Sequence, residues 1–181
     1  MRGKSHHQLG RYLADTYMST LPKRYIRAFL IGCVEPDRNP TTYLKGSLRQ
    51  QWLRGHNWNN AQNYMQRVSR RLESRRKLRL TDYYTLGKLI HYTVDAFTSA
   101  HNRYFSENLQ DHRQYEEALQ NYFIRYLAQC PDIWTDAAKP VMDTIRSYHL
   151  DYIHRPISIH TDTRFAIIVC SMVVTRVFAQ A

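Results

Sequence analysis

Two histidine–carboxylate pairs, each with a spacing of four residues, constrain the fold of this chain more than any other feature. His91 and Asp95 occur in H-Y-T-V-D, and His112 and Glu116 occur in H-R-Q-Y-E. Residues four apart lie on one face of an α-helix, with Cβ atoms about 6 Å from each other, so each pair predicts a helix that presents two ligand atoms together. One such pair alone is more often a solvated surface pair. Two pairs with His101 between them favour a metal cluster, because imidazole nitrogen and carboxylate oxygen are ligands of catalytic zinc.

Length and composition predict one domain with a hydrophobic core. The sequence has 181 residues, of which 43% are hydrophobic, enough for one core and too few for two. We therefore expect a compact single domain over residues 1–181. The longest apolar run, F-A-I-I-V-C-S-M-V-V, has about half of the roughly 20 residues that a membrane-spanning helix needs. It predicts a buried helix, and the sequence predicts no transmembrane segment.

The cysteines and the first residues of the sequence predict a cytoplasmic protein. Cys33, Cys130 and Cys170 are an odd number without a C-x-x-C motif, as expected of packing thiols in a reducing compartment. The sequence starts with M-R-G-K-S-H-H, in which histidines stand where a signal peptide would have its apolar stretch.

The chain is strongly basic. It has 26 Lys and Arg against 15 Asp and Glu, a formal net charge of +11, which favours phosphate-bearing partners. The excess is concentrated between Arg67 and Arg79, where Glu73 is the only acid. This run fits a solvated helix face, a peripheral contact with an anionic lipid surface, or a nucleic-acid contact, and charge alone does not choose among them.

Helical periodicity dominates the sequence. Apolar residues recur at spacings of three and four, no segment alternates as a strand would, and no internal repeat is present, so we expect an all-α domain of about seven helices. A first helix carries Leu9, Leu13 and Tyr17, and a second is expected over 22–31, ending at Gly32. The prolines and Asn39 that follow predict a long irregular segment over 33–49. The remaining helices are expected over about 57–77, 82–101, 111–130, 134–154 and 162–179.

Three further residues extend the candidate ligand set. Asp37 in V-E-P-D-R-N-P and His56 in W-L-R-G-H-N-W lie at either end of a polar, turn-rich stretch, which has little reason to be ordered unless it binds something. His6 lies at the start of the first helix.

The chain resembles the zinc-dependent phospholipase C family from Lys4 to about Tyr122. The resemblance is carried by S-H-H-Q-L-G-R-Y-L, I-G-C-V-E-P-D, R-G-H-N, G-K-L-I-H-Y-T-V-D-A-F-T-S-A-H-N and H-R-Q-Y-E. It implies an all-helical fold that holds up to three zinc ions in a cleft. It also implies cleavage of phosphodiester bonds, in phospholipids or, for the related three-zinc nucleases, in single-stranded nucleic acids.

Position by position, the resemblance implies a set of metal ligands. One zinc ion would be held by Asp37, His56, His91 and Asp95. A second would be held by His101, His112 and Glu116. Asp95 would also bridge to a third ion at His6, which fits the family histidine better than His7 because Leu9 and Leu13 then fall on the core side.

Two departures from the family pattern affect the expected chemistry. No counterpart of the family's processed N-terminal tryptophan precedes His6, so two zinc ions are expected and the third remains open. Arg38 replaces the aromatic residue that follows the loop aspartate in choline-specific enzymes, and it could instead hold a phosphate oxygen.

These features predict a zinc-dependent phosphodiester hydrolase of phospholipase C type. The metal ions would orient the phosphodiester and lower the pKa of a bound water, and Asp37, at the edge of the cluster, is the candidate general base. The alternatives are a single-strand nuclease that uses the same cluster and a metal-binding protein without enzymatic activity.

Overall fold

The computed structural model of the chain describes residues 3–39, 58–102, 109–129 and 138–180. Within these segments it is built from helices and contains no β-strand, which confirms the expected all-α fold. In chain order the elements are α1 (Gly3–Tyr17), α2 (Lys23–Arg38), α3 (Trp58–Glu73), α4 (Leu80–Ala96), the short 3₁₀ helix η2 (Ser99–His101), α5 (Leu109–Gln129), α6 (Val141–Tyr152) and α7 (Ile159–Ala179).

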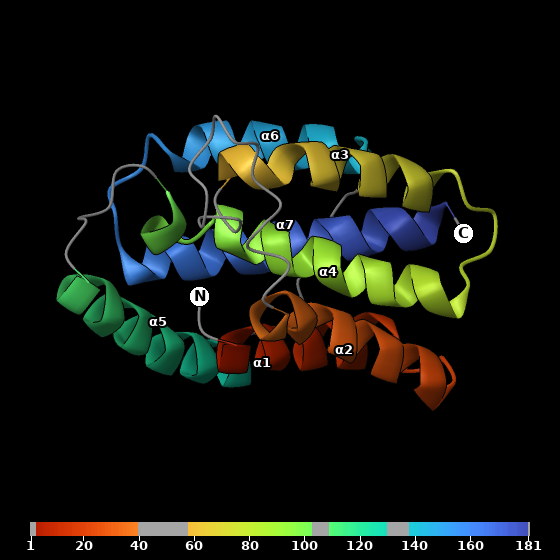
Figure 1. Cartoon of the computed structure of the whole chain (residues 1–181), viewed down its shortest axis with the longest axis horizontal. Helices are drawn as coiled ribbons and strands as arrows, with labels where there is room; N and C mark the ends of the chain where they lie inside the picture. The colour runs from red at the N-terminus through yellow and green to blue at the C-terminus, as the bar shows by residue number, and fades with distance from the viewer. Residues whose placement is uncertain (1–2, 40–57, 103–108, 130–137, 181) are drawn as a thin grey trace.

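The helices form three layers (Figure 1). α4 and α7 make the middle layer, α3 and α6 cover one side of it, and α1, α2 and α5 cover the other. α4 contacts α1, α2, α3 and α7. It is consequently buried along almost its whole length, from Leu86 to Ala96 without interruption.

The two central helices have well-defined starts. In α7 the Ser158 hydroxyl accepts a hydrogen bond from the Thr161 N–H at 3.0 Å, a standard N-cap. In α4 the N-cap is Arg79, and the carboxylate of Asp82 reaches back to accept from the Arg79 N–H at 2.9 Å. The helix starts at Leu80, slightly before the expected residue 82, and Asp82 caps it from inside its first turn.

A pair of glycines brings α2 and α4 into direct backbone contact. A Cβ on Gly32 would run into the carbonyl oxygen of Tyr84, and a Cβ on Gly87 would run into that of Phe29. Side chains at the contact normally keep helix axes about 8–10 Å apart. A side chain at either glycine would therefore hold α2 and α4 apart. The contact explains why α2 does not end at Gly32, as the sequence predicted: this glycine serves close packing instead of helix termination.

Several expected boundaries were wrong, and two errors matter for the site. α2 continues through Gly32 and Pro36 to Arg38, so Asp37 lies in the last turn of a helix and not in a loop. α4 ends at Ala96, and His101 belongs to a separate 3₁₀ turn instead of the same helix as Asp95. The rest of the expected irregular segment, 40–49, lies outside the described residues, as do 50–57 and 130–137.

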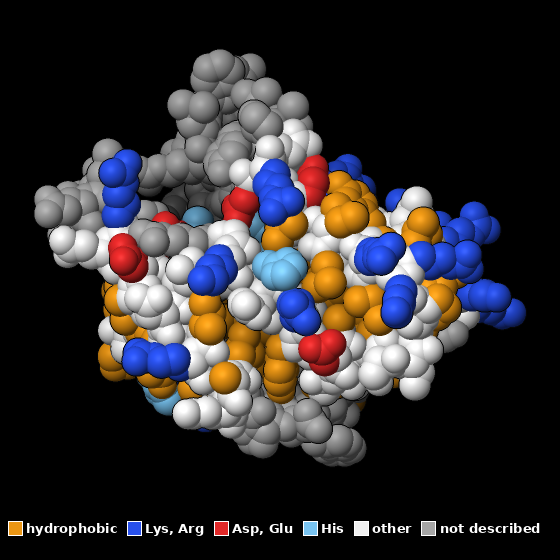
Figure 2. Space-filling model, turned by 90° about the horizontal axis from the view of Figure 1, so that it is seen from below, with side chains coloured by type: hydrophobic (Ala, Val, Ile, Leu, Met, Phe, Trp, Pro, Cys, Tyr) orange, Lys and Arg blue, Asp and Glu red, His pale blue; other side chains and the backbone are white. Residues whose placement is uncertain are grey.

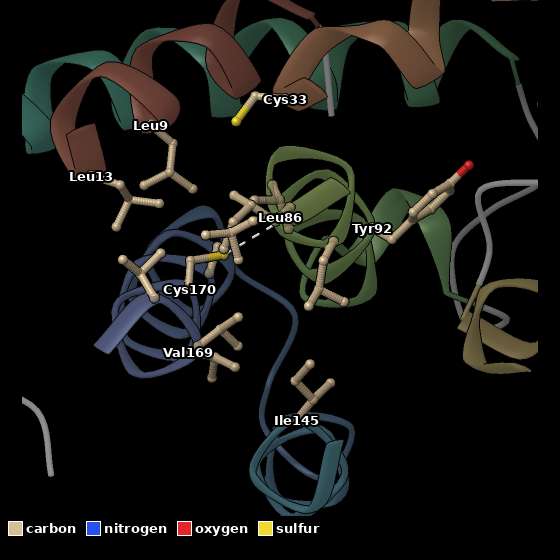
Figure 3. Packing of buried hydrophobic residues seen from close by; sticks show 14 of the residues in the cluster. Leu9, Leu13, Cys33, Leu86, Tyr92, Ile145, Val169 and Cys170 are labelled. Carbon is tan, nitrogen blue, oxygen red and sulfur yellow. Dashed lines mark hydrogen bonds between the residues drawn. The ribbon is translucent and has the colours of Figure 1, made fainter. Parts of the chain in front are cut away.

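The core is a single cluster of apolar side chains between the layers. Figure 3 shows Leu13 of α1, Leu86 of α4 and Val169 of α7 in this cluster. Cys33 and Cys170 are buried free thiols, in agreement with their expected packing role, while Cys130 lies outside the described residues. In the described part of the chain, no helix combines the length and apolar character needed to cross a membrane.

Candidate metal centre

Asp95, at the end of α4, is the point on which three histidines converge. Its Oδ2 lies 3.2 Å from His91 Nε2, one turn earlier on the same helix. Its Oδ1 lies 3.3 Å from His6 Nε2 on α1 and 3.6 Å from His101 Nε2 on η2. The carboxylate is 1% exposed, so both oxygens are directed at imidazoles inside the protein.

His91 is held in one orientation by the backbone of α2. Its Nδ1 lies 2.9 Å from the carbonyl oxygen of Cys33, and because a carbonyl only accepts, Nδ1 is the protonated nitrogen. The other ring nitrogen, Nε2, then faces the carboxylates of Asp95 and Asp37. A backbone carbonyl on the second ring nitrogen is the usual way in which a metal-binding histidine is oriented. The Gly32–Gly87 contact puts this carbonyl within reach.

The rings of His6 and His91 are stacked, with centroids 3.8 Å apart and planes inclined by 19°. His6 is 1% exposed, and neither of its ring nitrogens makes a hydrogen bond within the described residues. Burial and the neighbouring His91 lower the pKa of His6 to about 4, so its imidazole is neutral. His7, the next residue, is exposed. A neutral, buried imidazole without a hydrogen bond is suited to ligate a metal.

The Asp95 carboxylate and the histidines around it shift one another's pKa. Burial lowers the pKa of His91, but the Asp95 carboxylate outweighs it and raises that pKa above its ordinary value. Burial by itself would raise the pKa of Asp95, yet His101 and His91 are among the neighbours that hold it well below its usual range. Asp95 is therefore a charged carboxylate in a buried site, which requires a cation close by.

Asp37 lies at the more exposed side of this group. Its Oδ1 is 3.6 Å from His91 Nε2, and its side chain is 26% exposed. The last turn of α2 is fixed by Glu35, whose carboxylate lies 2.7 Å from Lys88 Nζ and accepts from the Asn39 side chain at 2.7 Å. Burial lowers the pKa of Lys88, but the hydrogen bond to Glu35 raises it above the ordinary value. This ion pair ties the segment around Asp37 to α4.

His101 and Glu116 form a second part of the site. His101 Nε2 lies 3.6 Å from Glu116 Oε1 on α5, and the two side chains are 21% and 16% exposed. Asp37, His101 and Glu116 thus lie at the more exposed side, whereas His6, His91 and Asp95 are buried. The site has a closed base and a more open rim.

Asp162 of α7 holds the two segments that carry His101 and Glu116. Its buried carboxylate accepts from the Ser99 N–H at 2.7 Å, the Ser99 hydroxyl at 2.8 Å, the Tyr152 hydroxyl at 2.8 Å and the Tyr115 hydroxyl at 2.9 Å. Ser99 lies two residues before His101, and Tyr115 is next to Glu116. Burial raises the pKa of Asp162, and these four donors oppose that effect.

The structure brings together six of the eight residues that the sequence singled out: His6, Asp37, His91, Asp95, His101 and Glu116. His56 lies outside the described residues. His112 lies in the first part of α5, but its side chain is also outside the described part of the chain. Spacing could not reveal the Cys33 carbonyl, the Lys88–Glu35 pair or Asp162, because each acts across long distances in sequence.

The donor set fits a zinc ion. His6, His91 and Asp95 each offer one ligand atom, and the three atoms lie within 4.8 Å of one another. Bond lengths of about 2.0–2.2 Å put neighbouring ligand atoms of tetrahedral zinc roughly 3.4 Å apart. Asp95 Oδ2 lies 3.2 Å from His91 Nε2, and Asp95 Oδ1 lies 3.3 Å from His6 Nε2. Each separation is close to that value, so either oxygen suits an ion held together with its own histidine.

The comparison with known protein families agrees with this geometry. A family model described as zinc dependent phospholipase C matches residues 5–165, most of the chain. The chain belongs to the zinc-dependent phospholipase C family. No curated protein matches it, and no solved structure does.

Membership in the zinc-dependent phospholipase C family accounts for the composition of the site. The match includes all six residues that the structure brings together and extends to the segment that contains Asp162. The family is zinc-dependent, and the buried His6, His91 and Asp95 are able to hold such an ion.

Proposed function

We propose that this protein is a zinc-dependent phosphodiester hydrolase that acts on phospholipids. The observation that carries the proposal is the convergence of His6, His91 and His101 on the buried carboxylate of Asp95. A charged carboxylate surrounded by imidazoles below an exposed rim has the donor chemistry of a catalytic zinc site, and family membership points to phospholipid as the substrate class.

The proposed ligand set has two parts that share Asp95. His91, Asp95 and Asp37 belong to one part, which His56 would complete. His101 and Glu116 belong to the other, which His112 would complete. His6 would allow a third ion, for which Asp95 is again the shared ligand. We propose at least two ions. The neutral ring of His6, stacked on His91, supports His6 of α1 as an additional metal ligand.

Each group of residues has a separate task in the proposed reaction. Bound zinc would supply positive charge for the phosphoryl oxygens and lower the pKa of a water molecule. Asp37 is the proposed general base: its Oδ1 lies 3.6 Å from His91 Nε2, and at 26% its side chain is more exposed than those of Asp95 and Glu116. Asp95 is 1% exposed and cannot meet a substrate in that way.

The rim also indicates how a phosphodiester would approach. Asp37, His101 and Glu116 come from three different elements and are each partly exposed. A substrate phosphate that enters at this side would reach the cluster without displacing core side chains. The glycerol and acyl portions of a phospholipid would remain outside.

Metal content and hydrolysis test the proposal together. Purified protein is assayed by elemental analysis and by turnover of bis-p-nitrophenyl phosphate, a set of phospholipids and labelled single-stranded DNA. The proposal expects stoichiometric zinc and release of a phosphorylated headgroup from phospholipid. Faster cleavage of single-stranded DNA would reassign the protein to the nucleases, and bound zinc without any turnover would make it a metal-binding protein.

A further inference from the structure

A hollow lined by both cationic and apolar residues lies where α3 connects to α4, away from the metal centre. It has a volume of about 560 Å³ and is lined by residues 74–80 and by Tyr25 of α2. The lining includes Arg75, Arg76, Lys77 and Arg79. The arginine-rich part of the sequence therefore does not form only a flat helix face: its last residues surround a concave site.

The acidic side chains near this pocket are already occupied. Asp82 is fully buried, and its carboxylate lies 2.9 Å from Arg71 and 3.9 Å from Arg75. Glu73 accepts from the Val141 N–H at 3.0 Å and lies 3.3 Å from Arg176. These contacts account for Arg71 and, in part, for Arg75.

Three cations in the pocket keep their charge uncompensated. Arg76, Lys77 and Arg79 are exposed, and none of them has a carboxylate within 4.0 Å among the residues that the structure describes. Three positive charges around one hollow raise the local concentration of anions and offer several donors to a single phosphate group.

We propose that this pocket binds the phosphorylated headgroup of an anionic membrane lipid. The cations would hold the phosphate oxygens. Leu80 lines the same pocket and is 46% exposed, although it is a large apolar residue. An exposed leucine beside a cluster of cations suits the boundary between headgroups and acyl chains, where apolar burial and attraction to anionic lipids add to each other.

The shape and the aromatic content of the pocket favour a headgroup over a nucleic acid. Single-strand binders use an extended basic track with aromatic rings on which bases stack. Among the described residues, Tyr25 is the only aromatic one that lines the pocket. Arg24 lies 4.9 Å over its ring, and the ring of Tyr83 packs against it at 4.8 Å, so its surface is already used.

The pocket is distinct from the proposed catalytic site. Leu80 opens α4 and Asp95 lies close to its end, so the two are about 22 Å apart along the helix axis, at 1.5 Å per residue. Figure 2 shows Lys and Arg side chains gathered at one end of the molecule, with histidine and acidic side chains around a hollow towards the other end of the same face. A lipid bound in the pocket would anchor the protein and would not be the molecule that is cleaved.

Vesicle binding tests the proposal separately from hydrolysis. The full chain is mixed with vesicles of phosphatidylcholine alone and with vesicles that also contain a phosphatidylinositol phosphate, and bound protein is measured by sedimentation. The test variant is Arg76→Gln, Lys77→Gln, Arg79→Gln, which leaves the Asp82 contacts intact. Its matched control, Arg125→Gln, Arg146→Gln, Arg164→Gln, removes the same charge from exposed positions on α5, α6 and α7.

The expected result is binding to the anionic vesicles that falls by on the order of 10²-fold in the test variant and by less than about threefold in the control. Leu80→Ser should weaken vesicle binding while binding of a soluble inositol phosphate stays unchanged. Equal losses in the two triple variants would overturn the proposal. So would tighter binding of single-stranded DNA than of the anionic vesicles, or equal binding to phosphatidylcholine alone.

Discussion

Gly32 of α2 and Gly87 of α4 face each other so closely that a Cβ on Gly87 would lie 2.9 Å from the Cα of Gly32. Both glycines are close in sequence to the site. Cys33, whose carbonyl accepts a hydrogen bond from His91, is the residue after Gly32, and His91 lies one helical turn after Gly87. The closeness of the two backbones is therefore what orients the His91 ring.

Gly87→Ala should destabilise the fold by about 3 kcal/mol, because the added methyl group must push α2 away from α4. The same shift should lengthen the His91–Cys33 hydrogen bond and weaken zinc binding. Urea unfolding and zinc titration measure both effects. Thr85→Ala, two residues earlier on α4, is the control and should change stability by less than about 0.5 kcal/mol. A Gly87→Ala protein as stable as that control would show that the helices can separate freely.

His6→Ala should lower the zinc content of the purified protein, because it removes a buried ligand atom next to Asp95. It should also lower the melting temperature of the zinc-loaded protein, since bound metal stabilises the folded state. His7→Ala is the matched control: His7 is the next residue on α1 and is exposed, so zinc content and melting temperature should stay unchanged. Equal effects of the two variants would remove His6 from the ligand set.

Asp37→Asn should reduce hydrolysis of a small phosphodiester by on the order of 10²-fold or more, because an amide keeps a ligand oxygen but cannot accept a proton. Zinc content should remain close to that of the unchanged protein. Asp15→Asn, an exposed position on α1, serves as the control for the loss of one negative charge. A near-native rate in Asp37→Asn would transfer the role of base to another group.

Asp162→Ala should lower the free energy of unfolding by about 3 kcal/mol or more, because it leaves buried donors of Ser99, Tyr115 and Tyr152 without their acceptor. It should also weaken zinc binding on the order of tenfold, since η2 and α5 lose their common anchor. Asp162→Asn should recover much of both, because the three hydroxyl groups can donate or accept. Asp151→Ala, which removes only the exposed pair with Arg155, is the control. No recovery in the Asn variant would mean that the charge itself is required.

We expect the buried His149 to make the folded protein less stable in acid. Burial lowers its pKa to about 4, so the unfolded chain binds a proton more readily than the folded protein between about pH 6.5 and pH 4. Stability should therefore fall as the pH falls through this window, and the contribution of His149 is about 2 kcal/mol at about pH 5. Urea unfolding of metal-free protein and of His149→Gln at about pH 7 and pH 5 measures it. His6 also has a lowered pKa, and it reduces the acid stability of the unchanged protein and of His149→Gln alike. The test of His149 is therefore how much more stability the unchanged protein loses on acidification than the variant does.

The parts of the fold that depend on local pattern were predictable. Apolar periodicity gave the positions of α1 and α7, and the four-residue spacing of His91 and Asp95 placed both on one face of a helix. The extension of α2 beyond Gly32 was not predictable, because glycine and proline normally end helices and only the partner glycine on α4 reveals the close approach. The stacking of His6 on His91 joins residues far apart in sequence, and no spacing rule indicates it.

The four hydrogen bonds to Asp162 also have a consequence for how the protein is made. Ser99 and Tyr115 precede this carboxylate by 63 and 47 residues. During synthesis the chain is extended from its N-terminus, so η2 and α5 emerge long before the residue that anchors them. His101 and Glu116 should therefore reach their final positions only after α7 has been added, and a nascent chain that stops at α6 should contain every proposed ligand yet lack a finished site.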